Sequence, residues 1–135
     1  MTVPSKFYIN CGGEKVDAPV NGTHRNATFT EDKDSRGPSR YVRSREHWAF
    51  SSTGNFLDND GDEDDYIGKN ISRLTMPDSQ LYTTARLSPL SLTYYGFCLC
   101  NGSYTVKLHF AEIMFSDDKS YRSLGKRIFD IYIQV

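Results

Sequence analysis

The sequence predicts an all-β protein with the pattern of an antiparallel β-sandwich. In several stretches apolar and polar residues alternate with a period of two, which is typical of strands with one face on a core. No stretch keeps a helical period over three turns. The aromatic fraction is 13%, and tyrosine, with 9 copies, favours half-buried surfaces that also form hydrogen bonds.

The first half of the chain predicts few strands. A short strand is expected at residues 7–10, and Gly12 and Gly13 end it. Residues 14–40 are polar and contain prolines and glycines, so we expect a loop that has room for one short strand. Residues 41–57 contain the single tryptophan and predict one or two strands.

The second half carries clearer strand signals. Residues 81–87 and 90–99 are rich in β-branched and aromatic side chains, and the Asn-Gly pair at 101–102 predicts a turn. Residues 104–113 and 128–135 alternate and predict two more strands, and the chain ends within the second of them. The apolar positions that share a face are Tyr104, Val106, Leu108 and Phe110 in the first, and Phe129, Ile131, Ile133 and Val135 in the second.

Length and charge limit the classes of function. The 135 residues predict one domain, which we place at residues 7–135 after leader residues 1–6. The formal net charge of -1 argues against a nucleic-acid partner. No stretch resembles a signal peptide or a membrane span, so this segment itself is expected to make no membrane contact. No phosphate-binding loop or metal-ligand spacing is present, so we expect no cofactor and no metal.

Cysteines and asparagines predict an oxidising compartment outside the cytosol. The three cysteines leave at least one unpaired, and Cys11 can form a long-range bridge with Cys98 or with Cys100. The chain also has four Asn-x-Ser/Thr sequons, which are the acceptor sites of N-glycosylation in secreted proteins. The sequons begin at Asn21, Asn26, Asn70 and Asn101.

The acidic run DNDGDEDDY at residues 58–66 raises a question about calcium. An EF-hand loop needs glycine at its sixth position and glutamate at its twelfth, where this chain has Glu63 and Lys69. Three interpretations remain: a calcium site of another kind, a solvated acidic loop, or one side of a cleft formed by Tyr66 at the end of the run.

Several ordered blocks resemble a known family. The blocks are YINCGG, WAFSSTGNFLD, LYTTARLSPLSLTYYG, NGSYTVKLHFAEIMF and SLGKRIFDIYIQ, and the match that they support runs from residue 7 to residue 135. They are similar to the malectin domain, most closely to the form in the ectodomains of plant receptor-like kinases with leucine-rich repeats. The resemblance implies a jelly-roll-like β-sandwich that this chain carries incompletely, truncated at its C-terminus.

The resemblance also implies a site and a place in the cell. It matches Tyr66 and Phe115 to aromatic residues with which the family's lectin stacks on sugar, and Asp64 or Asp65 would take sugar hydroxyls. Met114 and Leu87 stand where that lectin has tyrosines, and apolar side chains there suit a protein partner. The domain would lie on the extracellular face of the plasma membrane, as part of a single-pass receptor.

Two functions therefore follow, and neither is catalytic. The first is recognition of a glycan or a cell-wall carbohydrate. The alternative is docking of a peptide, a co-receptor protein or the adjacent leucine-rich repeats, without sugar binding. Glu112 and Asp130 lie on strands with otherwise apolar faces, and we interpret them as surface carboxylates and not as a glycosidase pair.

Overall fold

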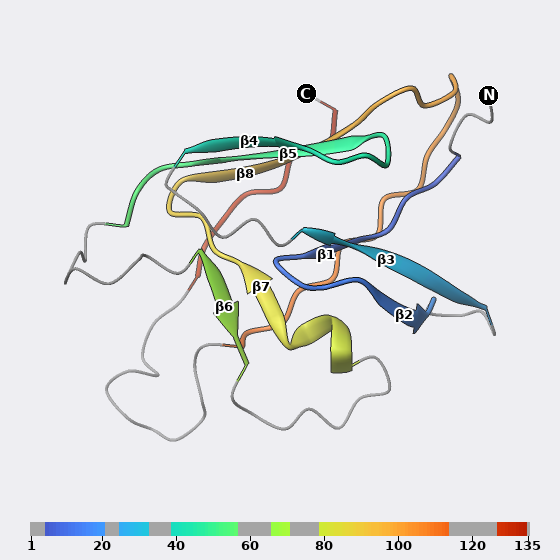
Figure 1. Cartoon of the computed structure of the whole chain (residues 1–135). Helices are drawn as coiled ribbons and strands as arrows, with labels where there is room; N and C mark the ends of the chain where they lie inside the picture. The colour runs from blue at the N-terminus through green and yellow to red at the C-terminus, as the bar shows by residue number, and fades with distance from the viewer. Residues whose placement is uncertain are drawn as a thin grey trace.

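The computed structural model of the chain describes residues 5–20, 25–32, 39–56, 66–70, 79–113 and 127–134. Within these residues the protein is all-β, which confirms the predicted class, and it contains one short 3-10 helix (Figure 1). The strands form three small sheets, in the orders β1-β3-β2, β4-β5-β8 and β6-β7. The elements are β1 (Ile9–Cys11), β2 (Val16–Pro19), β3 (Asn26–Asp32), β4 (Arg40–Arg43), β5 (Trp48–Thr53), β6 (Ile67–Lys69), η1 (Ser79–Tyr82), β7 (Thr84–Arg86) and β8 (Ser91–Gly96).

The first sheet has β3 at its centre. This strand pairs antiparallel with β2 and parallel with β1, so the sandwich is not purely antiparallel. The sequence allowed only one strand in residues 14–40, and that prediction was wrong because both β2 and β3 lie there. The inward positions near the end of β3 are Thr30 and Asp32, which are polar although they are buried. Buried and exposed positions therefore alternate along β3, but the hydrophobicity of its residues does not reveal this alternation.

The second sheet agrees with the sequence prediction. Its central strand, β5, pairs antiparallel with β4 on one side and β8 on the other. Trp48 and Phe50 point to the inner face of this strand and are among the most buried residues of the described chain. Figure 1 shows this sheet on one side of the molecule, with the other two sheets on the opposite side.

The third sheet is the antiparallel pair β6-β7. Of the predicted strand at residues 81–87, only β7 forms, because η1 takes up the preceding residues. The chain at Gly12 lies directly against β7: a Cβ at this position would be 2.4 Å from the backbone nitrogen of Arg86. Its φ of +79° is also unfavourable for other residues, so both space and backbone geometry require glycine here.

Residues 104–113 and 127–134 do not form the predicted strands. Both segments lack strand pairing in the structure, and apart from the buried Ile113 their large apolar side chains are exposed. Phe110 and Phe129 nevertheless lie 5.2 Å apart between ring centroids, and Arg127 pairs with Glu112 at 3.0 Å. Glu112 lies two residues after Phe110, and its partner Arg127 lies two residues before Phe129. The segments therefore run antiparallel and side by side without a hydrogen-bonded ladder.

A buried polar cluster joins the three sheets. Asp32 of β3 accepts two hydrogen bonds from the guanidinium of Arg86 in β7, at 2.8 Å and 2.6 Å, and its carbonyl accepts a third at 3.0 Å. The hydroxyl of Tyr94 in β8 donates to the same carboxylate. The guanidinium also lies 4.2 Å from the ring centroid of Phe50 in β5. Each sheet contributes at least one residue, so the cluster fixes how the sheets pack on one another.

Burial changes the acid–base properties of two groups in this cluster. Burial raises the pKa of the Tyr94 hydroxyl, and the neighbouring Cys11 and Asp32 raise it further. Burial also raises the pKa of the Cys11 thiol, although contact with Tyr94 opposes the shift. Cys11 is exposed when the whole residue is considered, so it is the thiol end that turns inward. Both groups are therefore neutral in the folded protein at physiological pH.

Among the described residues, no helix is both long enough and apolar enough to cross a membrane.

Candidate ligand-binding site

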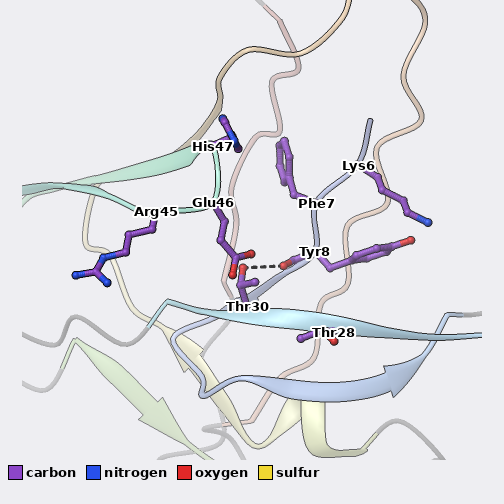
Figure 2. A pocket seen from close by; sticks show the side chains of 8 residues that line it. All are labelled: Lys6, Phe7, Tyr8, Thr28, Thr30, Arg45, Glu46 and His47. Atoms are coloured by element: carbon purple, nitrogen blue, oxygen red, sulfur yellow. Dashed lines mark hydrogen bonds between the residues drawn. The ribbon is translucent and has the colours of Figure 1, made fainter. Parts of the chain in front are cut away.

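A concavity lies between the first sheet and the turn that connects β4 to β5 (Figure 2). Its volume is about 430 Å³, which is within the range of sites for small ligands. One wall comes from the chain before β1 and from β3, and the other comes from the turn. The lining side chains are two aromatic residues, Phe7 and Tyr8; two hydroxyl residues, Thr28 and Thr30; and four charged or titratable residues, Lys6, Arg45, Glu46 and His47.

The turn has a defined shape that the sequence explains. The amide of Ser44 donates to the carbonyl of Trp48 at 2.9 Å and closes the hairpin. The amide of Glu46 donates to the side-chain oxygen of Ser44 at 3.1 Å, which is a serine turn. His47 has a φ of 61°, and its carbonyl accepts from the amide of Phe97 at 2.7 Å. These bonds hold the backbone of Glu46 and His47 at the edge of the concavity.

The opposite wall is equally fixed. The amide and the hydroxyl of Thr30 both donate to the carbonyl of Tyr8, each at 2.9 Å, so the chain before β1 lies against β3. The ring of Tyr8 packs on Phe29 with 5.2 Å between centroids. In Figure 2 the Phe7 ring and the Glu46 carboxylate point into the space between the walls, whereas Arg45 extends away from it.

A second concavity of about 510 Å³ lies on the other side of the same turn. It shares Thr30, Arg45 and Glu46 with the first, and it continues toward Trp48 and Phe50 of the core. The indole nitrogen of Trp48 is buried and has no hydrogen-bond partner within the structure as described. Both concavities thus include Arg45 and Glu46 of the turn in their lining.

These groups suit recognition and not covalent chemistry. An aromatic ring beside a carboxylate and hydroxyl groups is the combination that binds the apolar face and the hydroxyls of a sugar. Among residues 5–20, 25–32, 39–56, 66–70, 79–113 and 127–134, no cluster of three or more histidine, cysteine or acidic side chains is arranged to hold a metal.

Two of the site residues that the resemblance implied, Tyr66 and Leu87, are adjacent in the structure. The backbone carbonyl of Tyr66 accepts from the amide of Leu87 at 2.8 Å, where β6 and β7 pair. Tyr66 is only 3% exposed, and its ring packs on Phe56 with 5.3 Å between centroids. Its hydroxyl donates to the side-chain oxygen of Asn55 at 2.9 Å. In this conformation the faces of the Tyr66 ring are not available for stacking on a ligand.

The other predicted site residues divide into described and undescribed positions. Asp64, Asp65, Met114 and Phe115, together with the acidic run of residues 58–65, lie outside the described residues, as does the sequon at Asn21. Asn26 and Asn101 are exposed. Asn70 is half-buried, with its side-chain nitrogen 3.5 Å from the carbonyl of Tyr82.

The predicted bridge between Cys11 and Cys98 is not formed in the structure. Cys11, Cys98 and Cys100 are all free. The Cys11 thiol is turned toward Tyr94, whereas Cys98 lies in the chain after β8 with a φ of 57°. The alternative partner, Cys100, is also exposed and unbridged.

Sequence reasoning did not find the concavity at the β4–β5 turn. It attached no site to Tyr8, Glu46 or His47. One signal was available: the polar segment SREH lies between two predicted strands, which marks a hairpin turn and therefore an exposed group of polar side chains.

Comparisons with known proteins establish the family. The sequence model of the malectin domain matches residues 5–135, so the chain belongs to the malectin domain family. The malectin domain is a non-catalytic module. No solved structure matches the chain.

Similar proteins come from Arabidopsis thaliana. A probable LRR receptor-like serine/threonine-protein kinase is 54% identical over 134 residues, which is 96% of this chain and 13% of that protein. A second probable LRR receptor-like serine/threonine-protein kinase is 46% identical over 132 residues, with 96% of this chain and 12% of that protein covered. A third with the same description is 48% identical over 129 residues, with 95% and 13% covered. The chain thus spans about an eighth of the length of the relatives it matches, and the predicted resemblance is confirmed.

Proposed function

We propose that this domain is a carbohydrate-recognition module in the ectodomain of a plant receptor kinase, and that it binds sugar in the concavity beside the β4–β5 turn. The observation that carries the proposal is the lining of this concavity. The Phe7 ring and the Glu46 carboxylate both point into a space large enough for a small saccharide.

The binding chemistry follows from these groups. The Phe7 ring packs against the apolar face of a pyranose ring, while the Glu46 carboxylate accepts hydrogen bonds from its hydroxyls. The turn and β3 are hydrogen-bonded on both sides of the space, so the groups are positioned before the ligand arrives. Preorganisation of this kind lowers the entropy cost of binding.

The site implied by the family resemblance takes a modified role in this proposal. With its ring buried, Tyr66 acts as a positioning residue, and its hydroxyl orients the exposed amide of Asn55. Leu87, Met114 and Phe115 would contribute apolar contacts to the ligand, and Asp64 and Asp65 would accept hydrogen bonds from its hydroxyl groups.

The cellular context is supported by the relatives. They are described as receptor-like serine/threonine-protein kinases, and this chain corresponds to a small part of each. The exposed sequons at Asn26 and Asn101 are accessible to glycosylation, which supports a location on the extracellular face of the plasma membrane. Any kinase activity would belong to another part of such a receptor.

Docking of a protein is the second candidate, and a specific observation favours it. Residues 104–113 and 127–134 expose many large apolar side chains, which is unusual for an isolated soluble domain. They are Tyr104, Val106, Leu108, Phe110, Ile128, Phe129, Ile131, Tyr132 and Ile133. A co-receptor, a peptide or the adjacent leucine-rich repeats would cover this surface without contacting sugar.

Titration with soluble oligosaccharides distinguishes the two candidates. We expect binding of a neutral oligosaccharide to weaken at least fivefold in Glu46→Gln and in Phe7→Ala, as measured by calorimetry. Asp130→Asn is the matched control, because Asp130 is an exposed carboxylate in residues 127–134 and does not line the concavity. Binding that is absent in the wild-type chain, or equal in all variants, would rule out a sugar site in this concavity.

A further inference from the structure

The sheet β4-β5-β8 has an outer face that the concavity does not use. Side chains alternate across this sheet, and Trp48, Phe50 and Tyr94 take the inner face toward the polar cluster. The alternate positions therefore point away from the other two sheets. Figure 1 shows no other sheet on that side of β4-β5-β8. Cross-strand register places Tyr41, Ser51 and Thr93 in one row of the outer face and Arg43, Ala49 and Tyr95 in the next.

Two tyrosines form an exposed aromatic pair on this face. Tyr41 is 60% exposed and Tyr95 is 40% exposed, and their ring centroids are 6.2 Å apart with an angle of 56° between the planes. They belong to the two outer strands and lean toward each other over the central strand. This is allowed because the central strand has only Ala49 and Ser51 between them. The Ser51 hydroxyl and the Tyr95 hydroxyl are hydrogen-bonded at 3.1 Å, which fixes the position of one ring.

The surroundings of the pair are hydroxyl-rich. Thr53 and Ser91 form a hydrogen-bonded pair of hydroxyls at 2.6 Å in the next row, and Thr93 is exposed beside Ser51. Arg43 is the single charged side chain that the described strands place on this face, and its guanidinium lies 5.4 Å from the Phe97 ring centroid. The three strands supply no large aliphatic side chain to the face.

We infer that this outer face is a second carbohydrate-contact surface, which binds a single chain of neutral hexopyranoses across Tyr41 and Tyr95. The inference rests on the proposed function and extends it to a longer ligand. The exposed tyrosine faces stack on the apolar faces of sugar rings, and the rows of serine and threonine hydroxyls bond to the sugar hydroxyls.

Two features select the ligand class. The rings are inclined at 56°, so they form an angled surface that fits a soluble, bendable chain and not the flat face of a crystalline polymer. The face carries one cation in the described strands, already placed on the Phe97 ring, so it lacks the concentrated positive charge that would select a polyanion. A neutral chain is therefore the favoured occupant.

The test is a titration of the chain with cellohexaose and with maltohexaose, which share this chemistry but differ in linkage. We expect Tyr41→Ala and Tyr95→Ala each to weaken binding of at least one hexasaccharide roughly 3- to 10-fold. Tyr104→Ala is the matched control, because Tyr104 is 42% exposed but lies outside the three strands of this face. The affinity of this variant for the hexasaccharides should equal that of the wild type. Thr93→Glu keeps both rings and adds bulk and charge to the face, so it should also weaken binding even where an alanine variant fails to fold.

Glu46→Gln, measured in parallel, separates this inference from the proposed function. If Glu46→Gln weakens binding and the tyrosine variants and Thr93→Glu do not, the outer face is not a contact surface and the concavity stands. If the tyrosine variants weaken binding and Glu46→Gln does not, the outer face stands and the concavity fails. If neither cellohexaose nor maltohexaose binds the wild-type chain, both the outer-face inference and the proposed function are overturned. Tighter, Tyr41-dependent binding of polygalacturonate overturns the neutral ligand class.

Discussion

The sheet β4-β5-β8 and the two segments 104–113 and 127–134 have similar sequence patterns but different structures. In both, large apolar or aromatic side chains recur at every second position, as at Trp48 and Phe50 in the sheet and at Leu108 and Phe110 in the segments. In the sheet, Phe50 is 1% exposed and lies in a hydrogen-bonded ladder with a strand on each side. In the segments, Phe110 is 61% exposed, and neither segment has a strand assigned.

The difference shows what alternation does and does not predict. Alternation identifies a face that is suited to burial, but it does not supply the element that buries it. The inner face of β5 is covered because Asp32 and Arg86 bring the other two sheets against it. The corresponding face of residues 104–113 has no sheet packed against it in the described structure, and its contact with residues 127–134 is an antiparallel one, at Phe110–Phe129 and Glu112–Arg127.

The largest expected effect comes from removing the acceptor of the polar cluster. Asp32→Ala should lower the free energy of unfolding by about 5 kcal/mol, because it leaves the buried guanidinium of Arg86 without its carboxylate. Glu112→Ala is the matched control on the exposed segments, where the pair with Arg127 should contribute less than about 1 kcal/mol. Urea denaturation followed by tryptophan fluorescence measures both, and equal effects would show that the cluster does not hold the sheets together.

The next effect compares two phenylalanines directly. Phe50→Ala should cost about 4 kcal/mol, because it removes a buried ring that packs on Tyr94 and on the Arg86 guanidinium. Phe110→Ala removes a ring of the same size from an exposed position and should change stability by less than about 0.5 kcal/mol. A large loss in Phe110→Ala, measured in the same denaturation experiment, would mean that residues 104–113 are packed in solution.

The third prediction concerns alkaline pH. The folded-state pKa of Tyr94 is raised above its ordinary value of 10.0, so the folded state retains a proton that the unfolded state loses. Its contribution is therefore fully present below pH 10 and decreases as the pH rises further, by about 1.4 kcal/mol per pH unit. The raised pKa of Cys11, from 9.0, moves the start of the decrease to slightly lower pH.

Tyr94→Phe tests this assignment, because it removes the titrating hydroxyl and keeps the ring. The unfolding free energy of this variant should fall less steeply above pH 10 than that of the wild type. Tyr104→Phe is the matched control, because it also removes a tyrosine hydroxyl and keeps the ring, but at an exposed position outside the polar cluster. Identical slopes in wild type and Tyr94→Phe would assign the alkaline loss of stability to other groups.

Much of the fold followed from the sequence, but its polar parts did not. Strands β4, β5 and β8 were predicted because they are rich in aromatic and β-branched residues, such as Trp48, Phe50 and Tyr94. Strand β3 was missed because its buried positions include Thr30 and Asp32, whose burial depends on Tyr8 and on Arg86 far along the chain. No local pattern contains that information, since the partner residues are separated by more than twenty positions.

The candidate site shows the same limit. A resemblance identified Tyr66 as a stacking residue, but its exposure depends on Phe56 and Asn55, which pack against it from another segment. The concavity at the β4–β5 turn requires β3 and the turn to be adjacent, and that adjacency is a consequence of how the sheets pack. Residue type therefore indicated the chemistry of recognition, whereas the place of recognition required the fold.

The smallest expected effect tests whether the two exposed segments are paired at all. In a double-mutant cycle of Phe110→Ala and Phe129→Ala, the coupling energy should be about 0.5–1 kcal/mol, because the rings are 5.2 Å apart. The antiparallel alignment also places Leu108 beside Ile131, so a cycle between these residues should couple with the same sign. A cycle between Phe110 and Tyr132 is the control, because the alignment does not place them opposite each other. If no pair couples, the segments are independent in solution, and their alternating pattern then encodes a surface that another element must cover.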